Sequence, residues 1–458
     1  METKAHVKEQ NGIDYRASDE EKGHNNGSIL EKPRSTANHD DPFGNDDGEV
    51  QYRTMAWWQA ALIMIAETVS LGILSLPSAI AGIGMVPGVI LIIGLGIIAT
   101  YTGYTIGQFK AAYPFVHNMA DAGEVLLGPV GREVFGIAQT IFLTFVMGSH
   151  LLTFGLAMNA ITGHATCSIV WGLVGMLILF VVAIPRTLKQ VSYFSIAAFA
   201  SIVAAVFITM VALGVSPPNP VVHATVSTTF NSAFASVLNI VFAYAGHVAF
   251  FSFISELKDP KDFPKALGAL QIADSSMYLV IAVVIYRYAG PDVASPALGS
   301  TGSIVRKVAY GVALPTILLA GVIYGHVNTK YVYVRIFRGT KHIAERSRFA
   351  TGTWIGIALA LWIIAWIIAE SIPVFNDLVG LISALFAANF TYTLSGVFWL
   401  FINAGKWFSN WRKISLTIVN LFIVALGLTV CGVGLYSSGK AIHEHSVQGA
   451  GKAWNCET

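Results

Sequence analysis

Residues 66–77 read AETVSLGILSLP and lie in the middle of a hydrophobic run, at about residues 56–81, that is long enough to cross a bilayer. The stretch contains a carboxylate, several hydroxyls, a glycine and a proline among apolar residues. A second stretch, residues 241–247 (VFAYAGH), interrupts a later hydrophobic run in a similar way. Irregular backbone at membrane depth is tolerated only where it is buried in protein or lines a cavity. The two stretches therefore predict interrupted helices around a buried site.

The composition of the whole chain indicates a membrane protein. Of its 458 residues, 54% are hydrophobic and 12% are charged. A soluble domain carries about 25% charged residues, so the composition excludes an ordinary soluble enzyme and a disordered chain. The net charge of +2 argues against a nucleic-acid binder, and three cysteines exclude a disulfide-rich scaffold.

The first 53 residues differ from the rest of the chain. They hold 7 basic and 12 acidic residues and show almost no aliphatic pattern. Such a segment cannot bury enough apolar surface to fold, so we expect a disordered cytoplasmic tail. Its lysines should be accessible to modifying enzymes such as the ubiquitin machinery: Lys4, Lys8, Lys22 and Lys32.

The remaining chain contains eleven apolar runs of spanning length. They lack the alternation of a membrane β-barrel and are too long for its strands. The expected spans are 56–81, 87–108, 133–158, 166–185, 191–215, 230–255, 267–288, 306–336, 351–371, 376–404 and 414–436.

The basic residues of the connecting loops predict the orientation. With the N-terminus inside, the inner loops hold sixteen Lys and Arg residues and the outer side holds five. Cytoplasmic loops carry the excess of basic residues, so we expect a cytoplasmic N-terminus. An odd number of spans then places the C-terminal segment, residues 437–458, outside.

The two interrupted spans, the first and the sixth, occupy corresponding positions in two halves of five spans each. Interrupted helices at equivalent positions of inverted repeats are the sequence indication of a transporter's binding site. The repeats would cover about residues 56–215 and 230–404, and the eleventh helix, 414–436, would be an addition.

Several motifs carry a family resemblance. The stretch 67–77 with its GILSLP core, residues 242–247 (FAYAGH) and the following segments 256–260 (ELKDP) and 262–265 (DFPK) resemble the amino acid/auxin permease family. The loop segments NMADAGE (118–124) and GPVGRE (128–133) resemble fungal neutral amino acid permeases of the N-system type. The resemblance covers about residues 54–436.

The resemblance implies an all-α polytopic membrane protein with the leucine-transporter-type 5+5 inverted-repeat fold plus one helix. It also implies secondary active transport of neutral amino acids by alternating access at a plasma membrane, driven by a proton gradient rather than by sodium or a bound cofactor. Two alternatives remain: a vacuolar exporter of the same fold, and an amino acid sensor that does not transport. No catalytic constellation emerges, so an enzyme is not expected, and no Cys/His cluster suggests a metal site.

An amino acid substrate offers a carboxylate, an ammonium and a side chain. A half-helix that begins near Ser70 would direct free N–H groups at the carboxylate, and carbonyls released near the sixth-span break could accept from the ammonium. Gly72 would allow close backbone approach, or it would serve helix packing alone. The expected substrate-binding residues are Thr68, Val69, Ser70, Leu71, Gly72, Phe242, Ala243, Tyr244, Ala245 and Gly246.

Three ionisable residues are candidates for proton coupling. A charged carboxylate at the centre of a membrane helix costs about 2.5–3.5 kcal/mol, so Glu67 is functional by default, although a neutral Glu67 could simply hold broken backbone together. His247 could titrate or donate to a freed carbonyl, and Asp274 could face a polar cavity or pair with a neighbour. Asn328 and Thr329 could retain a cation site, with helix-to-helix hydrogen bonding as the alternative.

Two cysteines fall on the side that the topology places outside. Cys167 lies at the start of the fourth span and Cys456 near the C-terminus. Disulfides persist on the oxidising side of a membrane, so we predict a Cys167–Cys456 bridge. Two unpaired thiols are the alternative.

Overall fold

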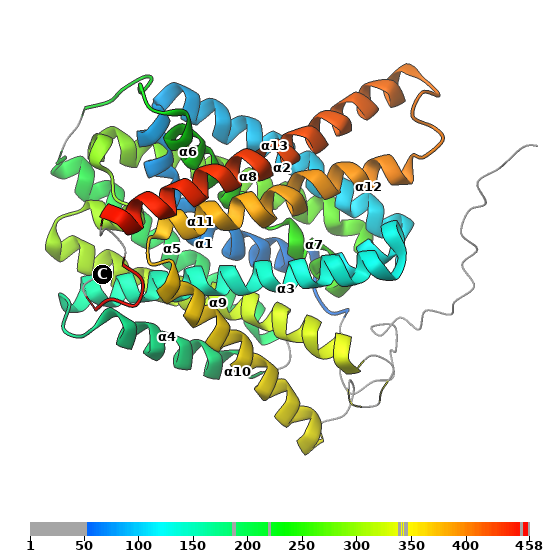
Figure 1. Cartoon of the computed structure of the whole chain (residues 1–458), viewed down its shortest axis with the longest axis horizontal. Coiled ribbons are helices and arrows are strands. Elements are labelled where there is room, and N and C mark those ends of the chain that lie inside the picture. Colours follow the sequence, from blue (N-terminus) through cyan, green and yellow to red (C-terminus); the bar gives the residue numbers. More distant parts are fainter. Residues whose placement is uncertain are drawn as a thin grey trace, which may run out of the picture. The chain divides into compact units, whose positions relative to one another are not determined.

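The computed structural model describes residues 53–185, 189–218, 221–337, 340, 342, 347–448 and 452–456, with the backbone alone for residues 189–194 and 448. The predicted tail, apart from Arg53, lies outside the described residues. The helices, shown in Figure 1, are α1 (Trp57–Ile83), α2 (Met85–Ala112), α3 (Met119–Thr162), α4 (Ser168–Ala183), α5 (Lys189–Val215), α6 (Phe230–Ala243), α7 (His247–Glu256), η1 (Pro260–Asp262), α8 (Phe263–Ala289), η2 (Gly290–Asp292), η3 (Ala297–Ser300), α9 (Ser303–Phe337), α10 (Arg348–Ser371), α11 (Phe375–Ile382), the π-helix η5 (Ser383–Thr393), α12 (Leu394–Ile402) and α13 (Trp411–Gln448).

The all-helical prediction is confirmed. Within the described ranges, ten helical segments are long and apolar enough to cross a membrane, with α6–α7 and α11–α12 each counted as one. The shorter α4 occupies the predicted fourth span; its 16 residues extend about 24 Å. The part of the chain that the structure describes contains no strand, only an isolated bridge between Met55 and Leu257.

The helices that surround the centre of the bundle come from both halves of the chain. α1 packs against α5, α6 and α8, and α3 packs against α9 and α10. α13 runs alongside α11, η5 and α12 (Figure 1). The centre is therefore enclosed by α1 and α6 on one side and by α3 and α9 on the other.

The prediction of an interrupted first helix is wrong. α1 is continuous from Trp57 to Ile83 and includes Pro77. Proline lacks an N–H and removes one helical hydrogen bond. Two nearby hydroxyls bond to backbone carbonyls of the same helix: Ser75 Oγ donates to Gly72 O (2.9 Å), and Ser78 Oγ donates to Ser75 O (2.8 Å). Serine hydroxyls and packed neighbours are the usual means by which membrane helices tolerate proline.

α3 begins earlier than the expected third span and contains a sharp corner. Asn118 caps its start, because its Oδ1 accepts from Asp121 N at 2.9 Å. Gly128 then adopts φ +67°, a left-handed conformation that favours glycine, and Pro129 follows it. The loop motif at residues 118–133 thus encodes a cap and a corner before the spanning part of α3.

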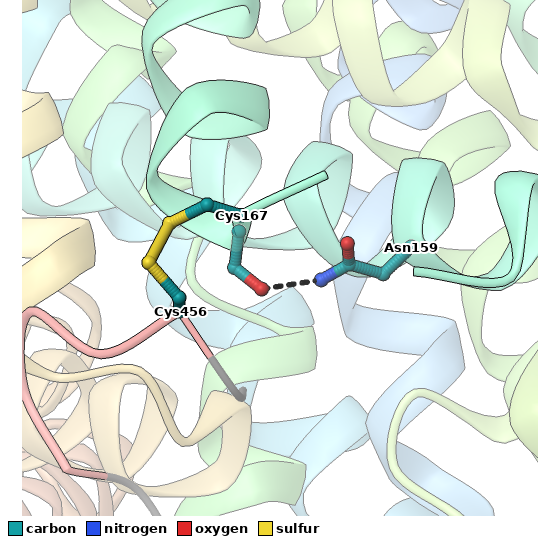
Figure 2. Close-up of a disulfide and its surroundings, with 4 residues drawn as sticks. Asn159, Cys167 and Cys456 are labelled. Carbon is teal, nitrogen blue, oxygen red and sulfur yellow. Dashed lines mark hydrogen bonds between the residues drawn. A yellow bond between two sulfur atoms is a disulfide. The ribbon is translucent and has the colours of Figure 1, made fainter. Parts of the chain in front are cut away.

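The two ends of the described chain lie on opposite sides of the helix bundle. At one end Met55 N donates to Glu256 O (3.0 Å) and Lys258 N donates to Met55 O (2.9 Å), beside the end of α7. At the other end the expected bridge is present: Cys167 and Cys456 form a disulfide with their Cα atoms 4.4 Å apart (Figure 2). Cys167 lies after α3 has crossed away from the Met55 side, which agrees with an odd number of crossings.

Candidate transport site

A small buried cavity lies at the centre of the bundle, where the α6–α7 break meets α1, α3 and α9. It has about 320 Å³ of empty volume, of which only a small part is wide enough for a water molecule. That is room for about one water molecule, so an amino acid requires the walls to move apart. The cavity is lined by Glu67, Thr68, Leu71, Gly72, Phe142, Val146, His150, Phe242, Ala245, Gly246 and Tyr324.

The predicted break in the sixth span is present. α6 ends at Ala243 and α7 begins at His247, so three residues of non-helical backbone lie between them. Tyr278 on α8 donates its hydroxyl to Ala243 O (2.8 Å), and Ala245 N donates to Phe242 O (3.0 Å). The carbonyls at the end of α6 thus have partners within the protein.

The start of α7 faces the cavity through Gly246 and Ala245. The first N–H groups of any helix have no intrahelical partner, and the N-terminal end of a helix attracts negative charge. Because α1 is continuous, the expected half-helix near Ser70 is absent. The backbone position suited to a substrate carboxylate is therefore the start of α7.

Two glycines bring the walls close together. A Cβ added at Gly72 would lie 2.8 Å from Ala243 Cα, and one added at Gly246 would lie 2.8 Å from Thr68 Cγ2. Gly72 therefore serves helix packing and the cavity wall at once, whereas the sequence left these two roles as alternatives.

Glu67 is buried at the cavity wall. Its side chain is 3% exposed, and its Oε1 atom has no hydrogen-bond partner among the described residues. Neighbouring Thr68 donates to Asp274 Oδ2 on α8 at 2.7 Å and to Met64 O at 2.9 Å. Asp274 does not line the cavity, but it is one hydrogen bond away from a residue that does.

His247 points away from the cavity. Its Nε2 lies 3.0 Å from Ala99 O and 2.9 Å from Thr102 Oγ1, both on α2. Since a carbonyl can only accept, the contact with Ala99 O is a hydrogen bond in the tautomer that carries a proton on Nε2. The carbonyl that it contacts thus belongs to α2 rather than to the break, and a titrating role remains a prediction.

Four predicted substrate-binding residues do not line the cavity. Ala243 packs against Gly72, and Tyr244 extends to α2, where its hydroxyl donates to Ile92 O (3.0 Å). Val69 and Ser70 are buried on another side of α1.

Asn328 takes part in helix-to-helix hydrogen bonding. Its Nδ2 donates to Thr144 Oγ1 (2.9 Å) and Thr140 O (3.2 Å) on α3. Within the described residues no group of three or more His, Cys, Asp or Glu side chains could hold a metal ion. A cation role for Asn328 and Thr329 remains a prediction.

The α3 and α9 walls of the cavity were not predicted from the sequence. Phe142, Val146 and His150 recur every four residues and so share one face of α3. Tyr324 on α9 completes the lining, and its ring centroid lies 5.7 Å from that of His150. The sequence feature that could have indicated a cavity wall is a polar atom in an apolar span. Among these four residues, His150 and Tyr324 have such an atom, whereas Phe142 and Val146 do not.

A larger cavity, the vestibule, lies on the side of the basic loops and has about 860 Å³ of empty volume. Gln139 on α3 and Val327 on α9 line it, each about one helical turn from the central-cavity residues Phe142 and Tyr324. The two cavities therefore adjoin the same pair of helices, with the vestibule on the basic-loop side of the central cavity.

A family model described as "Transmembrane amino acid transporter protein" matches residues 53–438. The chain belongs to this family. It is 34% identical over 422 residues to the "N amino acid transport system protein" of Neurospora crassa, an alignment that covers 90% of each chain.

Two solved transporters share the fold. Mhp1, a nucleobase-cation-symport-1 family transporter in a closed conformation with bromovinylhydantoin bound, superposes with a TM-score of 0.53 at 12% identity, over 87% of this chain and 94% of that one. MhsT in complex with L-phenylalanine gives a TM-score of 0.50 at 14% identity, over 86% and 99%. At such low identity the likeness concerns the fold alone, and it confirms the leucine-transporter-type architecture.

Proposed function

We propose that this member of the family is a proton-coupled symporter that carries neutral amino acids into the cell by alternating access. The observation that carries the proposal is the position of Glu67, a buried carboxylate on the wall of the central cavity beside a helix break. A carboxylate there can exchange a proton where the substrate binds, so that proton entry and substrate entry depend on each other.

The cavity walls support a neutral substrate. Leu71, Phe142, Val146 and Phe242 offer apolar surface to a side chain, and no Lys or Arg is among the lining residues. The N-terminal end of α7 supplies partial positive charge for the α-carboxylate. Glu67 supplies the opposite charge for the ammonium when it is ionised.

The proposed direction of transport, into the cell, rests on the proposed orientation. The vestibule lies on the side of Lys258, Lys330 and Arg335, which basic loops mark as cytoplasmic. The disulfide between Cys167 and Cys456 lies on the opposite side, where an oxidising environment preserves it. We place the protein in the plasma membrane, with the vestibule as the exit into the cytoplasm.

Uptake by proteoliposomes tests this proposal. We expect wild-type protein to accumulate radiolabelled L-leucine or L-phenylalanine when the side of substrate addition is acidic, without sodium. Glu67→Gln should lose pH-driven accumulation and retain part of its substrate exchange, because the amide keeps the shape but cannot exchange a proton. Glu370→Gln, on α10 and outside the central cavity, is the matched control and should retain coupling.

Concentrative uptake by Glu67→Gln at the wild-type level would remove Glu67 from the coupling mechanism. Accumulation that requires sodium and does not depend on pH would show that sodium, rather than the proton, is the coupling ion. Wild-type protein that binds amino acids without moving them would favour a sensor.

A further inference from the structure

Hydrogen bonds link neighbouring parts of the vestibule wall in this conformation. Ser255 Oγ on α7 lies 2.8 Å from His117 Nδ1, and Gln139 Oε1 accepts from Met119 N at 3.0 Å. The backbone of Glu256 is held as well, because its carbonyl accepts from Met55 N at 3.0 Å. The cavity is therefore a built compartment rather than a gap between loose loops.

An ion pair joins α7 and α9 across this compartment. Lys330 Nζ on α9 lies 3.1 Å from Glu256 Oε1 at the end of α7, and their side chains are only 19% and 11% exposed. Arg335, which also lines the vestibule, pairs with Glu133, and their side chains are 39% and 49% exposed and so lie nearer the solvent. A pair as sheltered as Lys330–Glu256 is poorly screened by water and salt.

This pair is complementary to a zwitterion. An α-amino acid carries an ammonium and a carboxylate on the same carbon, so it can place its carboxylate against Lys330 and its ammonium against Glu256 at once. Each charge of the substrate then faces an opposite charge of the pair. The loss of water around the substrate is then offset by charge-assisted hydrogen bonds, and neither protein charge is left buried without a partner, which would be costly.

We propose that the vestibule is a second binding site for a zwitterionic amino acid, at which Lys330 receives the carboxylate and Glu256 receives the ammonium. The site lies between the central cavity and the basic side of the membrane. It takes the substrate when α7 and α9 separate. As the ion pair opens, the substrate's carboxylate becomes the partner of Lys330 and its ammonium becomes the partner of Glu256. Opening of the pair therefore does not leave the two protein charges without partners. This inference rests on the proposed function, because it assumes that amino acids cross the protein.

The test compares the two faces of the protein. We expect Lys330→Gln and Glu256→Gln to raise the half-saturation concentration of L-leucine, measured in inside-out vesicles, by about tenfold, as the loss of one charged contact predicts. From the other side, in whole cells, the value should stay within about twofold. Lys265→Gln is the control, because it removes an ion pair on the same side of the membrane but outside the vestibule, with Lys265 65% exposed.

The double variant Lys330→Gln with Glu256→Gln separates a binding site from a simple latch. A latch predicts easier opening and an unchanged or lower half-saturation concentration from the basic side, and that result would overturn the proposal. A binding site predicts a rise at least as large as in either single variant. Leucinamide and 4-methylpentanoate, which each lack one charge, should compete poorly with L-leucine at the basic side of the wild type.

A measurement on the unaltered protein covers the case in which the variants fail to fold. Equilibrium dialysis of purified wild type should show two classes of L-leucine site per chain, and one class alone would overturn the second site. Failure of the proposed function looks different, because the wild type would then not transport L-leucine or L-phenylalanine from either face.

Discussion

Gly72 and Gly246 set the spacing of the cavity walls, and each acts on a different neighbour. A side chain at Gly72 would press on the backbone of Ala243, whereas one at Gly246 would press on the Thr68 side chain. Gly246 has φ −71°, so any residue can adopt its backbone conformation. The effect of a substitution at either position is therefore steric.

We expect Gly72→Ala to reduce substrate binding and transport by about tenfold or more, because the added methyl group forces α1 and α6 apart. Overpacking of this kind costs about 1–3 kcal/mol, so the melting temperature should fall as well. Gly94→Ala is the matched control, since a Cβ there meets nothing within 4 Å. Ligand-induced thermal shifts and uptake by correctly inserted protein measure both effects. Unchanged affinity in Gly72→Ala would show that the glycine serves packing alone.

At the scale of single residues, the sequence could reveal only part of the site. Glu67 was recognisable because a carboxylate is rare in an apolar span. Phe142 and Val146 were not, because an apolar residue in an apolar run looks the same whether it faces lipid, a neighbouring helix or a cavity. Their position is decided by which face of α3 packs on α9 and lines the cavity, and that is information from tertiary structure.

At the scale of elements, the two suspected breaks had different outcomes for a physical reason. In α1 the hydroxyls of Ser75 and Ser78 bond to carbonyls of the same helix, and the helix continues through Pro77. At the end of α6 the carbonyl of Ala243 is taken by Tyr278, which comes from α8. The sequence of a span shows its glycines and prolines but not a partner that another helix supplies, so it could not distinguish the two cases.

The role of Tyr278 in the α6–α7 break can be tested directly. Tyr278→Phe leaves the buried carbonyl of Ala243 without a partner, which costs about 1–3 kcal/mol, and it should lower the melting temperature and transport together. Tyr286→Phe on the same helix is the control, because its hydroxyl accepts from His223 N in an exposed loop, where water can replace it. Equal losses in the two variants would show that the hydroxyl of Tyr278 has no special role in the break.

At the scale of the whole molecule, the C-terminal segment connects parts of the fold that are distant in sequence. After α13, Trp454 N donates to Glu370 O on α10 (3.2 Å), and the Trp454 ring meets Trp366 edge-on at 5.5 Å. The disulfide then links Cys456 to Cys167, 289 residues earlier, where Asn159 Nδ2 donates to Ser168 Oγ at 2.7 Å (Figure 2). The sequence could predict this bridge because the count of spans placed both cysteines on one side. The ring and backbone contacts that position Trp454 could not be predicted from spacing.

We expect Cys167→Ser and Cys456→Ser to release the C-terminal segment to the same extent. Because a disulfide is typically worth about 2–4 kcal/mol, each variant should speed protease cleavage near residues 452–456 by about tenfold or more, measured on intact cells with an external protease. The double variant should add nothing, since both single changes break the same bond. Cys431→Ser within α13 is the control and should leave cleavage unchanged. Cleavage that occurs only after cells are opened would place the C-terminus inside and contradict the odd number of spans together with the proposed orientation.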